Sequence, residues 1–273
     1  MATKTSIRKS LMSTRSLGID IGGTKARYGV LNKDSLHDQG SEVSRPQTPE
    51  TLTNQCREIA DRFKNIKNVG IAIPGPLDRD GILHHPPNFP HWGRVNFKAL
   101  LRKTLKHAFV LERDSVAALV AEWKLGVAKD KHNVVLLTIG TGIGGAAIVD
   151  GKLLRGHHGF SGELGHVYVG PHGRTCGLGH DGCVEAWASG KALEDRVPLE
   201  TATHAFAHLL RSMELAFDPE LIVLTGGMSQ FEAYVASALQ KVKLIGLHTD
   251  VKVGKFGEWA GVVGAALLAQ DHS

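Results

Sequence analysis

Asp20-Ile21-Gly22-Gly23-Thr24-Lys25 is a glycine-rich stretch near the start of the chain, and Gly140-Thr141-Gly142-Ile143-Gly144-Gly145 is its counterpart in the second half. Each glycine-rich stretch lies between two apolar segments that are typical of β-strands, so each predicts a hairpin. A weak internal duplication of this kind is what two stacked lobes with equivalent hairpins require. Because backbone N–H groups at such turns can approach phosphate oxygens, the pattern favours a phosphate-binding protein of the α/β class.

Apolar runs and helical spacing alternate along the rest of the chain. Strands are predicted at residues 17–21, 25–31, 68–73, 107–111, 134–139, 146–149 and 221–225, and helices at 51–64, 115–125 and 261–270. We expect a small N-terminal lobe over residues 16–111, joined by a C-terminal helix over 260–273, and a large lobe over 112–259. A ligand site is expected in the cleft between the lobes.

The composition indicates an ordered globular protein with more than one core. The chain has 273 residues and a mass of 29.4 kDa, which passes the size at which single cores usually stop growing. The net charge of +5 is spread over interleaved acidic and basic residues, so no nucleic-acid partner is expected. The same surplus suits a nucleotide or a polyphosphate. No apolar run approaches the ~20 residues of a membrane helix, so no membrane association is expected.

The cysteines indicate a reducing compartment. Three cysteines in a long chain are an odd number, so we expect no disulfide framework and a cytoplasmic location. Residues 1–16 carry basic side chains among serines and threonines, without the apolar core of a signal peptide. We expect a frayed tail, with a short organelle-targeting segment as the alternative.

The first glycine stretch offers side chains as well as backbone. Thr24 and Lys25 would add a hydroxyl and a cation beside a phosphate, and Asp20 could hold Mg²⁺ through water. The alternative is an ordinary hairpin turn. The second glycine stretch favours the phosphate interpretation.

A carboxylate lies at the junction of a predicted strand and a predicted helix. Asp114 follows the apolar run and precedes the helix, where a side chain would point into a cleft and could act as a general base. Aspartate is equally suited to a helix N-cap, and the segment taken alone favours that simpler role.

Histidines and cysteines gather in a glycine-rich stretch further along. His166, Cys176 and Cys183 are ligands of the kind that bind structural zinc, and a closed site needs four ligands. The fourth ligand is left open among His180, Asp181, His172 and a water molecule. A metal-free loop with two buried thiols is the alternative.

Taken together, these motifs resemble the ROK family, named for repressor, open reading frame and kinase, whose enzymes include bacterial glucokinases, fructokinases and N-acetylmannosamine kinases. The resemblance spans nearly the whole chain. Asp20 to Lys25 and Gly140 to Gly145 are similar to the two phosphate loops of the family. Pro87-Asn88-Phe89 with Trp92 is similar to its sugar-contacting segment, and Thr225-Gly226-Gly227 is similar to its adenosine-side turn. The resemblance implies the two-lobed actin-like ATPase fold, which is ribonuclease H-like, with an active site between the lobes.

The resemblance also implies a function. It implies transfer of the terminal phosphoryl group of ATP, with Mg²⁺, to a hexose-type sugar at the 6-hydroxyl, with Asp114 as the catalytic base, and a homodimer. The implied sugar contacts are Asn88, Arg113, Asp114, Glu163, His166 and Glu185, with His166 also a zinc ligand. The implied nucleotide contacts are Asp20, Gly22, Gly23, Thr24, Lys25, Thr141, Gly142, Gly226 and Gly227.

Two residues depart from the family pattern. Leu178 stands where the zinc loop usually has its middle cysteine, which puts zinc binding in question. Arg113 stands where the family usually has an asparagine that touches the sugar. The longer cation could narrow the pocket, select a sugar with an acidic group, or pair with Asp114 and lower its pKa.

Three alternatives to an ATP-dependent sugar kinase are considered. A non-catalytic sensor that binds sugar and nucleotide on the same fold is compatible with the two departures. Inorganic polyphosphate is an alternative donor. A repressor is not expected, because the sixteen residues before Leu17 show no helix-turn-helix pattern.

Overall fold

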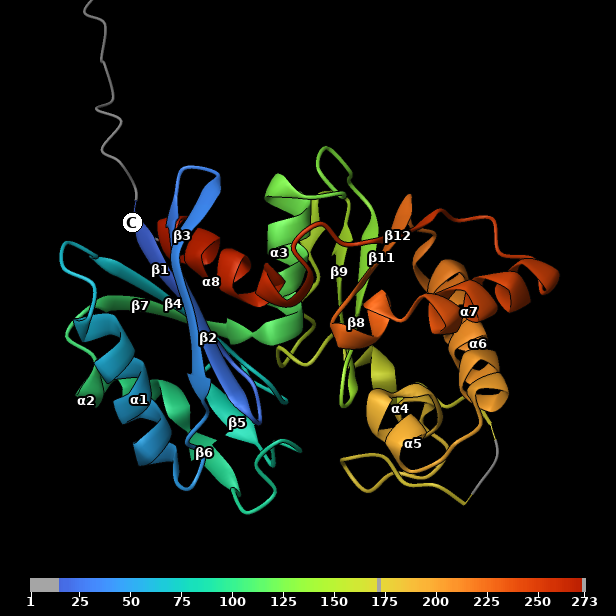
Figure 1. The fold of residues 1–273 in the computed structure, drawn as a ribbon, viewed down its shortest axis with the longest axis horizontal. Helices are drawn as coiled ribbons and strands as arrows, with labels where there is room; N and C mark the ends of the chain where they lie inside the picture. The colour runs from blue at the N-terminus through green and yellow to red at the C-terminus, as the bar shows by residue number, and fades with distance from the viewer. Residues whose placement is uncertain (1–14, 171–172, 272–273) are drawn as a thin grey trace, which may run out of the picture.

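Two five-stranded sheets stand side by side in the molecule (Figure 1). The computed structural model describes residues 15–170 and 173–271. The predicted frayed tail lies almost entirely outside the described residues, and so does the candidate ligand His172. No helix in the described part of the chain combines the length and the apolar character needed to span a membrane.

The first sheet comes from the N-terminal part of the chain. Its strands are β1 (Ser16–Ile21), β2 (Lys25–Asn32), β3 (Ser35–Val43), β4 (Asn68–Ile73) and β7 (Ala108–Arg113), in the order β3-β2-β1-β4-β7. Helices α1 (Pro49–Asp61) and α2 (Phe97–Thr104) and the small sheet of β5 (Ile82–His84) and β6 (Arg94–Asn96) accompany it. Thr48 caps α1 by accepting a hydrogen bond from Thr51 N, and Pro49 suits its first turn.

The second sheet comes from the later part of the chain. Its strands are β8 (Val134–Ile139), β9 (Ile143–Val149), β10 (Lys152–Leu153), β11 (Leu221–Thr225) and β12 (Val251–Val253), in the order β10-β9-β8-β11-β12. Its helices are α4 (Val184–Ala188), α5 (Gly190–Glu194), α6 (Leu199–Phe217) and α7 (Glu232–Leu244). Short 3₁₀ turns lie at Leu164–His166, Gly227–Gln230 and Gly257–Trp259.

The two sheets have the same pairing pattern. In the first sheet, β1 pairs antiparallel with β2 and parallel with β4; in the second, β8 pairs antiparallel with β9 and parallel with β11. The outer strands also match, since β3 and β10 are antiparallel to their neighbours whereas β7 and β12 are parallel. The internal duplication predicted from the glycine stretches is therefore confirmed.

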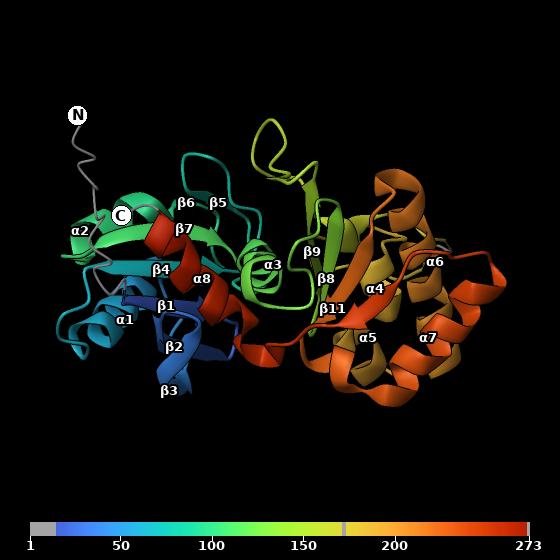
Figure 2. The same ribbon diagram turned by 90° about the horizontal axis from the view of Figure 1, so that it is seen from above.

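Two helices lie between the sheets. Figures 1 and 2 show α3 (Asp114–Leu125) and α8 (Ala260–Asp271) crossing near the middle of the molecule, with α8 lying along β1 and β4. The crossing requires glycine, because a Cβ on Gly264 would come within 1.6 Å of the Ala117 carbonyl oxygen. The residue limits of the two lobes stay a prediction.

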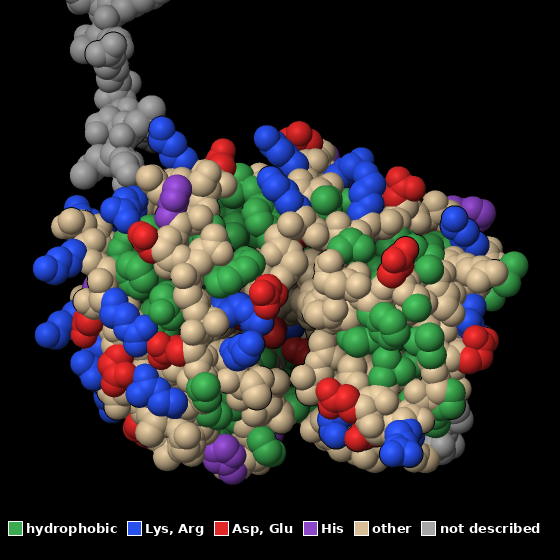
Figure 3. All heavy atoms as spheres, viewed as in Figure 1, with side chains coloured by type: hydrophobic (Ala, Val, Ile, Leu, Met, Phe, Trp, Pro, Cys, Tyr) green, Lys and Arg blue, Asp and Glu red, His purple; other side chains and the backbone are tan. Residues whose placement is uncertain are grey.

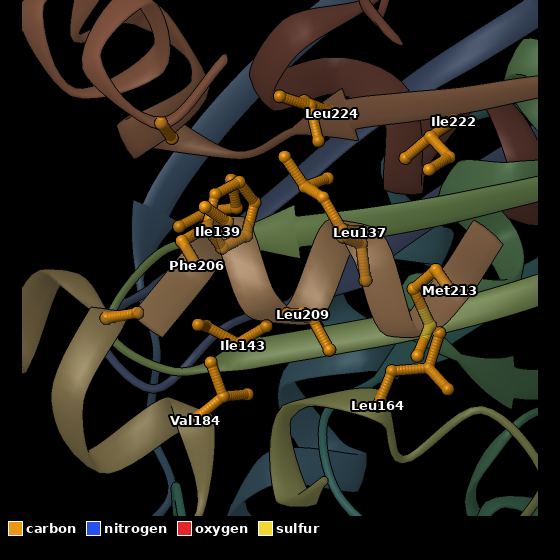
Figure 4. Close-up of a cluster of buried hydrophobic side chains, with 14 of the residues drawn as sticks. Leu137, Ile139, Ile143, Leu164, Val184, Phe206, Leu209, Met213, Ile222 and Leu224 are labelled. Carbon is orange, nitrogen blue, oxygen red and sulfur yellow. The ribbon is translucent and has the colours of Figure 1, made fainter. Parts of the chain in front are cut away.

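A large apolar core fixes the carboxyl ends of β8 and β11. Figure 4 shows side chains of these strands, Leu137, Ile139, Ile222 and Leu224, packed against Phe206 and its neighbours on α6. Each such side chain contributes roughly 1.5–3 kcal/mol when fully buried. This packing holds in place the glycine turns that follow the two strands.

The start of α3 corrects one prediction. The N-cap of α3 is Arg113, whose side chain makes no capping hydrogen bond, and Asp114 is already the first helical residue. The N-cap role considered for Asp114 is therefore wrong. The strand before it also runs two residues further than predicted, to Arg113.

Candidate active site

The first glycine turn faces the segment predicted to contact sugar. Gly22 N donates to Lys25 O at 2.8 Å and closes the turn between β1 and β2. A Cβ on Gly23 would lie 3.5 Å from Asn88 Nδ2, so Asn88 reaches the turn from a distant part of the chain. Thr24 and Lys25 are exposed. The backbone and side chains of this turn are thus available to one ligand beside Asn88.

The second glycine turn is held from two sides. Gly190 N and Lys191 N, at the start of α5, donate to Gly140 O at 2.7 Å and Thr141 O at 3.3 Å. From the other side, Ile143 N donates to Glu185 Oε2 at 2.9 Å. Glu185 fills the space beside Gly142, where a Cβ would lie 2.4 Å from Oε2. The turn is therefore fixed without using the exposed side chain of Thr141.

A cavity opens beside the third glycine turn. Its volume is about 610 Å³, within the range of small-ligand sites, and Gly226, Gly227, Lys255, Phe256 and Trp259 are among its lining residues. Gly226 has φ of +86°, and a Cβ there would meet Ile139 O at 2.5 Å, so no other residue fits. The predicted adenosine-side turn thus borders a cavity of suitable size. Sequence reasoning missed the two aromatic residues, which carry no motif.

Two carboxylates come together between the sheets. The pKa of Asp114 is raised to about 6, chiefly by burial and also by the charge of Glu163, although the Ser115 N–H and Arg113 lower it. The pKa of Asp20 is raised to about 7, chiefly by burial and also by the charge of Asp114. Both side chains keep some exposure to solvent. Since the charge of Asp114 disfavours the ionised form of Asp20, a divalent cation bound between or beside them would be stabilised, and the pair fits Mg²⁺.

Arg113 pairs with Glu163 and not with Asp114, the partner considered from the sequence. Its Nη1 donates to Glu163 Oε1 at 3.0 Å and its Nη2 donates to Ser161 O, and its side chain is only 4% exposed. The pairing with Asp114 considered from the sequence is therefore wrong. Arg113 does lower the pKa of Asp114 through its charge, but burial outweighs this effect.

Glu163, the partner of Arg113, also lies near His166. Glu163 Oε2 lies 3.9 Å from His166 Nε2, one turn along the 3₁₀ segment. Glu163 also acts on Asp114 through its charge, so the three side chains belong to one region. The surface is hollowed between the two halves of the molecule (Figure 3). The structure thus gathers Asp20 from β1, Asp114 from the start of α3, and Glu163 and His166 from one loop.

His166 also belongs to a cluster of metal-binding side chains. One ligand atom from each of His166, Cys176, His180 and Cys183 lies within 4.8 Å of the others. His166 Nδ1 is buried and has no hydrogen-bond partner, and both thiols are buried. Two thiols and two imidazoles at this spacing fit the four ligands of a structural zinc site.

A second cavity was not anticipated from the sequence. It has a volume of about 380 Å³ and is lined by charged and aromatic residues, Asp78, Arg79, Asp80, His84, Arg94, His157, His158 and Phe160. His84 Nε2 lies 2.8 Å from Asp78 Oδ2, and Arg79 N donates to His158 O at 3.2 Å. Asp78 therefore stands beside the loop that leads to Glu163. These residues are scattered in the chain, so no spacing signals them.

Comparison with known proteins identifies the family. The ROK family model matches residues 16–204 and 198–272. The chain belongs to the ROK family. It is 29% identical to a glucokinase of Streptomyces coelicolor, over 94% of this chain and 98% of the relative. It is 32% identical to an N-acetylmannosamine kinase of Escherichia fergusonii, over 94% and 99%.

A solved structure agrees with these relatives. The crystal structure of a ROK family glucokinase from Streptomyces griseus, in complex with glucose and AMPPNP, matches with a TM-score of 0.84 and 26% identity, covering 94% of this chain and 99% of that one. The resemblance predicted from the sequence, the two-lobed actin-like fold and the carbohydrate-kinase class are therefore confirmed for this ROK protein.

Proposed function

We propose that this ROK protein transfers the γ-phosphoryl group of ATP to the 6-hydroxyl of a hexose-type sugar. The observation that carries the proposal is the pair of Asp20 and Asp114, two carboxylates with raised pKa values between two phosphate-loop hairpins. A base with a pKa close to the working pH suits proton removal from an alcohol. The relatives and the solved structure that match this chain support the same reaction.

Asp114 accepts the proton of the attacking hydroxyl in this proposal. The sugar oxygen forms a bond to the γ-phosphorus while the bond from that phosphorus to the β,γ-bridging oxygen breaks, and ADP leaves with the electron pair. The proton passes from Asp114 to solvent. Mg²⁺ supplies charge neutralisation on the phosphates when bound, and Asp20 would hold it through water.

The nucleotide contacts follow from the three glycine turns. The phosphates would meet Gly22, Gly23, Thr24 and Lys25 in the first turn. In the second turn, the phosphates would contact Thr141 and Gly142. The adenosine would occupy the cavity of about 610 Å³ beside Gly226 and Gly227, where Phe256 and Trp259 offer apolar surface.

The sugar contacts are proposed for the short polar groups around Asp114. Asn88, Glu163 and His166 would hydrogen-bond the hydroxyl groups, and Glu185 would use lone pairs not engaged by backbone N–H groups. Arg113 donates a hydrogen bond to Glu163, so its proposed role is to position this sugar contact. A structural zinc ion on His166, Cys176 and Cys183 and a cytoplasmic homodimer complete the proposal.

The test is ADP release with Mg²⁺-ATP against glucose, mannose, fructose and N-acetylated hexoses. We expect turnover with at least one sugar and none with the 6-deoxy analogue of that sugar. Asp114→Asn should lower kcat about 100- to 10,000-fold and leave sugar affinity much less changed.

Three results would change the proposal. Binding of sugar and nucleotide without ADP formation would establish the sensor. Product formation with polyphosphate but not with ATP would change the donor. Phosphorylation of the 6-deoxy sugar would move the reaction to another hydroxyl.

A further inference from the structure

The loop between Cys176 and Cys183 is folded as a miniature hairpin. Cys176 N donates to His180 O at 2.9 Å, Gly179 N donates to Cys176 O at 2.9 Å, and Thr175 and Asp181 form an antiparallel bridge. Gly179 has φ of +82°, which a tight turn here requires. Residues that face each other across an antiparallel pair project to the same side, so this turn brings the side chain of His180 to the side of Cys176.

A second short pairing brings the other two candidate ligands together. Tyr168 and Cys183 form an antiparallel bridge, and Val184 N donates to Val167 O at 3.0 Å. The thiol of Cys183 lies 3.6 Å from His166 O. The backbone pairing of both segments, and not the side chains alone, therefore assembles the cluster.

Leu178 lies at the tip of the hairpin and cannot bind a metal. Its side chain packs against the buried cluster of Cys176, Cys183 and Ala186. Two thiols and His166 supply three ligands, one fewer than a closed tetrahedral zinc site needs. His180 is the further ligand that lies within 4.8 Å of all three among the described residues. Asp181 instead accepts a hydrogen bond from Gly173 N at 3.0 Å.

We propose that His180 supplies the fourth zinc ligand that Leu178 does not, so that this chain holds zinc in a Cys₂His₂ site formed by His166, Cys176, His180 and Cys183. The buried and unpaired Nδ1 of His166 is the atom that most needs such a partner. The inference rests on the zinc component of the proposed function. Its test measures metal binding, so its outcome is independent of whether the chain phosphorylates a sugar.

The site is also connected to the second phosphate loop. Gly177, inside the hairpin, donates to Glu185 Oε1 at 3.1 Å, and Glu185 Oε2 accepts from Ile143 N at 2.9 Å. One carboxylate therefore joins the metal hairpin to the turn at Gly142. Loss of zinc is expected to loosen Glu185 and to raise the KM for ATP more than it lowers kcat.

The first experiment measures zinc per chain and zinc affinity for the purified full chain and for His180→Ala. We expect one bound zinc in the native chain. Loss of a direct ligand should lower zinc affinity by more than the about 10- to 100-fold that loss of an outer-shell partner costs. Three matched variants, His172→Ala, Asp181→Asn and His157→Ala, should retain native affinity. Retention of native affinity in His180→Ala, or its loss in His172→Ala or Asp181→Asn, would overturn the assignment. So would a native chain that binds no zinc when zinc is added.

The second experiment separates ligand loss from misfolding. Leu178→Cys in the His180→Ala background should restore zinc binding, because it returns a thiolate to the same hairpin. With Co²⁺ as the probe, the native chain should give tetrahedral ligand-field bands and thiolate charge-transfer absorption. The rescued variant should give stronger thiolate absorption than the native chain, since a third sulfur binds. No rescue in a variant whose circular dichroism is native would count against the proposal.

Discussion

Arg113 Nη1 donates a hydrogen bond to Glu163 Oε1 across 3.0 Å, joining the end of β7 to the loop before His166. The same guanidinium donates to Ser161 O, so one side chain holds this loop twice. Its position directly before Asp114 gives it two effects. It positions a predicted sugar contact, and its charge lowers the pKa of the predicted base.

The first prediction concerns the energy of this ion pair. Arg113→Met should lower the free energy of unfolding by about 1–3 kcal/mol, because a buried donor is lost and Glu163 is left without its partner. Glu163→Gln in the same background should recover part of the loss, with a coupling energy of about 0.5–3 kcal/mol. Urea unfolding measures both.

The matched control is an exposed ion pair. Arg57 Nη1 lies 3.5 Å from Asp61 Oδ2, with the two side chains 38% and 48% exposed. Arg57→Met should change stability by no more than about 0.5 kcal/mol. Equal losses at Arg57 and Arg113 would refute a special role for the buried pair.

The second prediction is the pH dependence of turnover. The assay uses Mg²⁺ in excess, which should keep Asp20 ionised although its pKa is raised to about 7. Asp114 must be ionised to accept a proton, and its pKa is raised to about 6, so kcat/KM should then rise with pH to a plateau above this value. Glu163→Gln removes a charge that raises this pKa, so its acid limb should move to lower pH even if the rate falls. Arg113→Met removes a charge that lowers the pKa and should move the limb the other way. Identical pH profiles for all three proteins would exclude Asp114 as the titrating group.

The sequence predicted the elements that are mostly apolar. Strands at residues 68–73, 134–139 and 221–225 were predicted to the residue, because both of their faces are covered and nearly every position is buried. By contrast, β3 was missed. Most of its side chains are exposed and polar, and it is held by its pairing with β2. Backbone pairing does not depend on side-chain type, so it leaves no alternation of apolar and polar residues by which the strand could be recognised in the sequence.

The site was predictable where a motif carries the chemistry. The glycine turns were found from the sequence because glycine alone permits the close approach seen at Gly226, beside the cavity proposed for adenosine. The partner of Arg113 could not be predicted, since the choice between Asp114 and Glu163 depends on how a loop 50 residues away folds back. Phe256 and Trp259, which line this cavity, were missed because apolar lining residues have no fixed spacing in a sequence.

The third prediction concerns the stability cost of Asp114, the proposed catalytic carboxylate. The folded pKa of Asp114 lies above its ordinary value of 3.8, so folding favours the neutral acid. The resulting stability is complete below pH ~4 and is lost as the pH rises through about 6. Asp114→Asn, which stays neutral, should therefore be more stable than the native chain at pH 8 by about 1–3 kcal/mol. Partial exposure of Asp114 favours the lower end of this range.

The measurement is the melting temperature of both proteins across pH 4 to 8, without Mg²⁺ or nucleotide. The difference between them should vanish near pH 4 and grow towards pH 8. A constant difference at every pH would show that the substitution acts through packing. A more stable native chain at pH 8 would contradict the raised pKa.

The fourth prediction tests the crossing of α3 and α8. Gly264 has no room for a methyl group, because its Cβ would lie 1.6 Å from the Ala117 carbonyl oxygen. Gly264→Ala must separate the two helices and should cost about 1–3 kcal/mol or more of unfolding free energy. Since α3 begins at Asp114, the displacement should also lower kcat. Gly93→Ala is the control, because a Cβ there meets nothing within 4 Å. If Gly264→Ala matched this control in both stability and kcat, close contact at the crossing would be irrelevant to the position of Asp114.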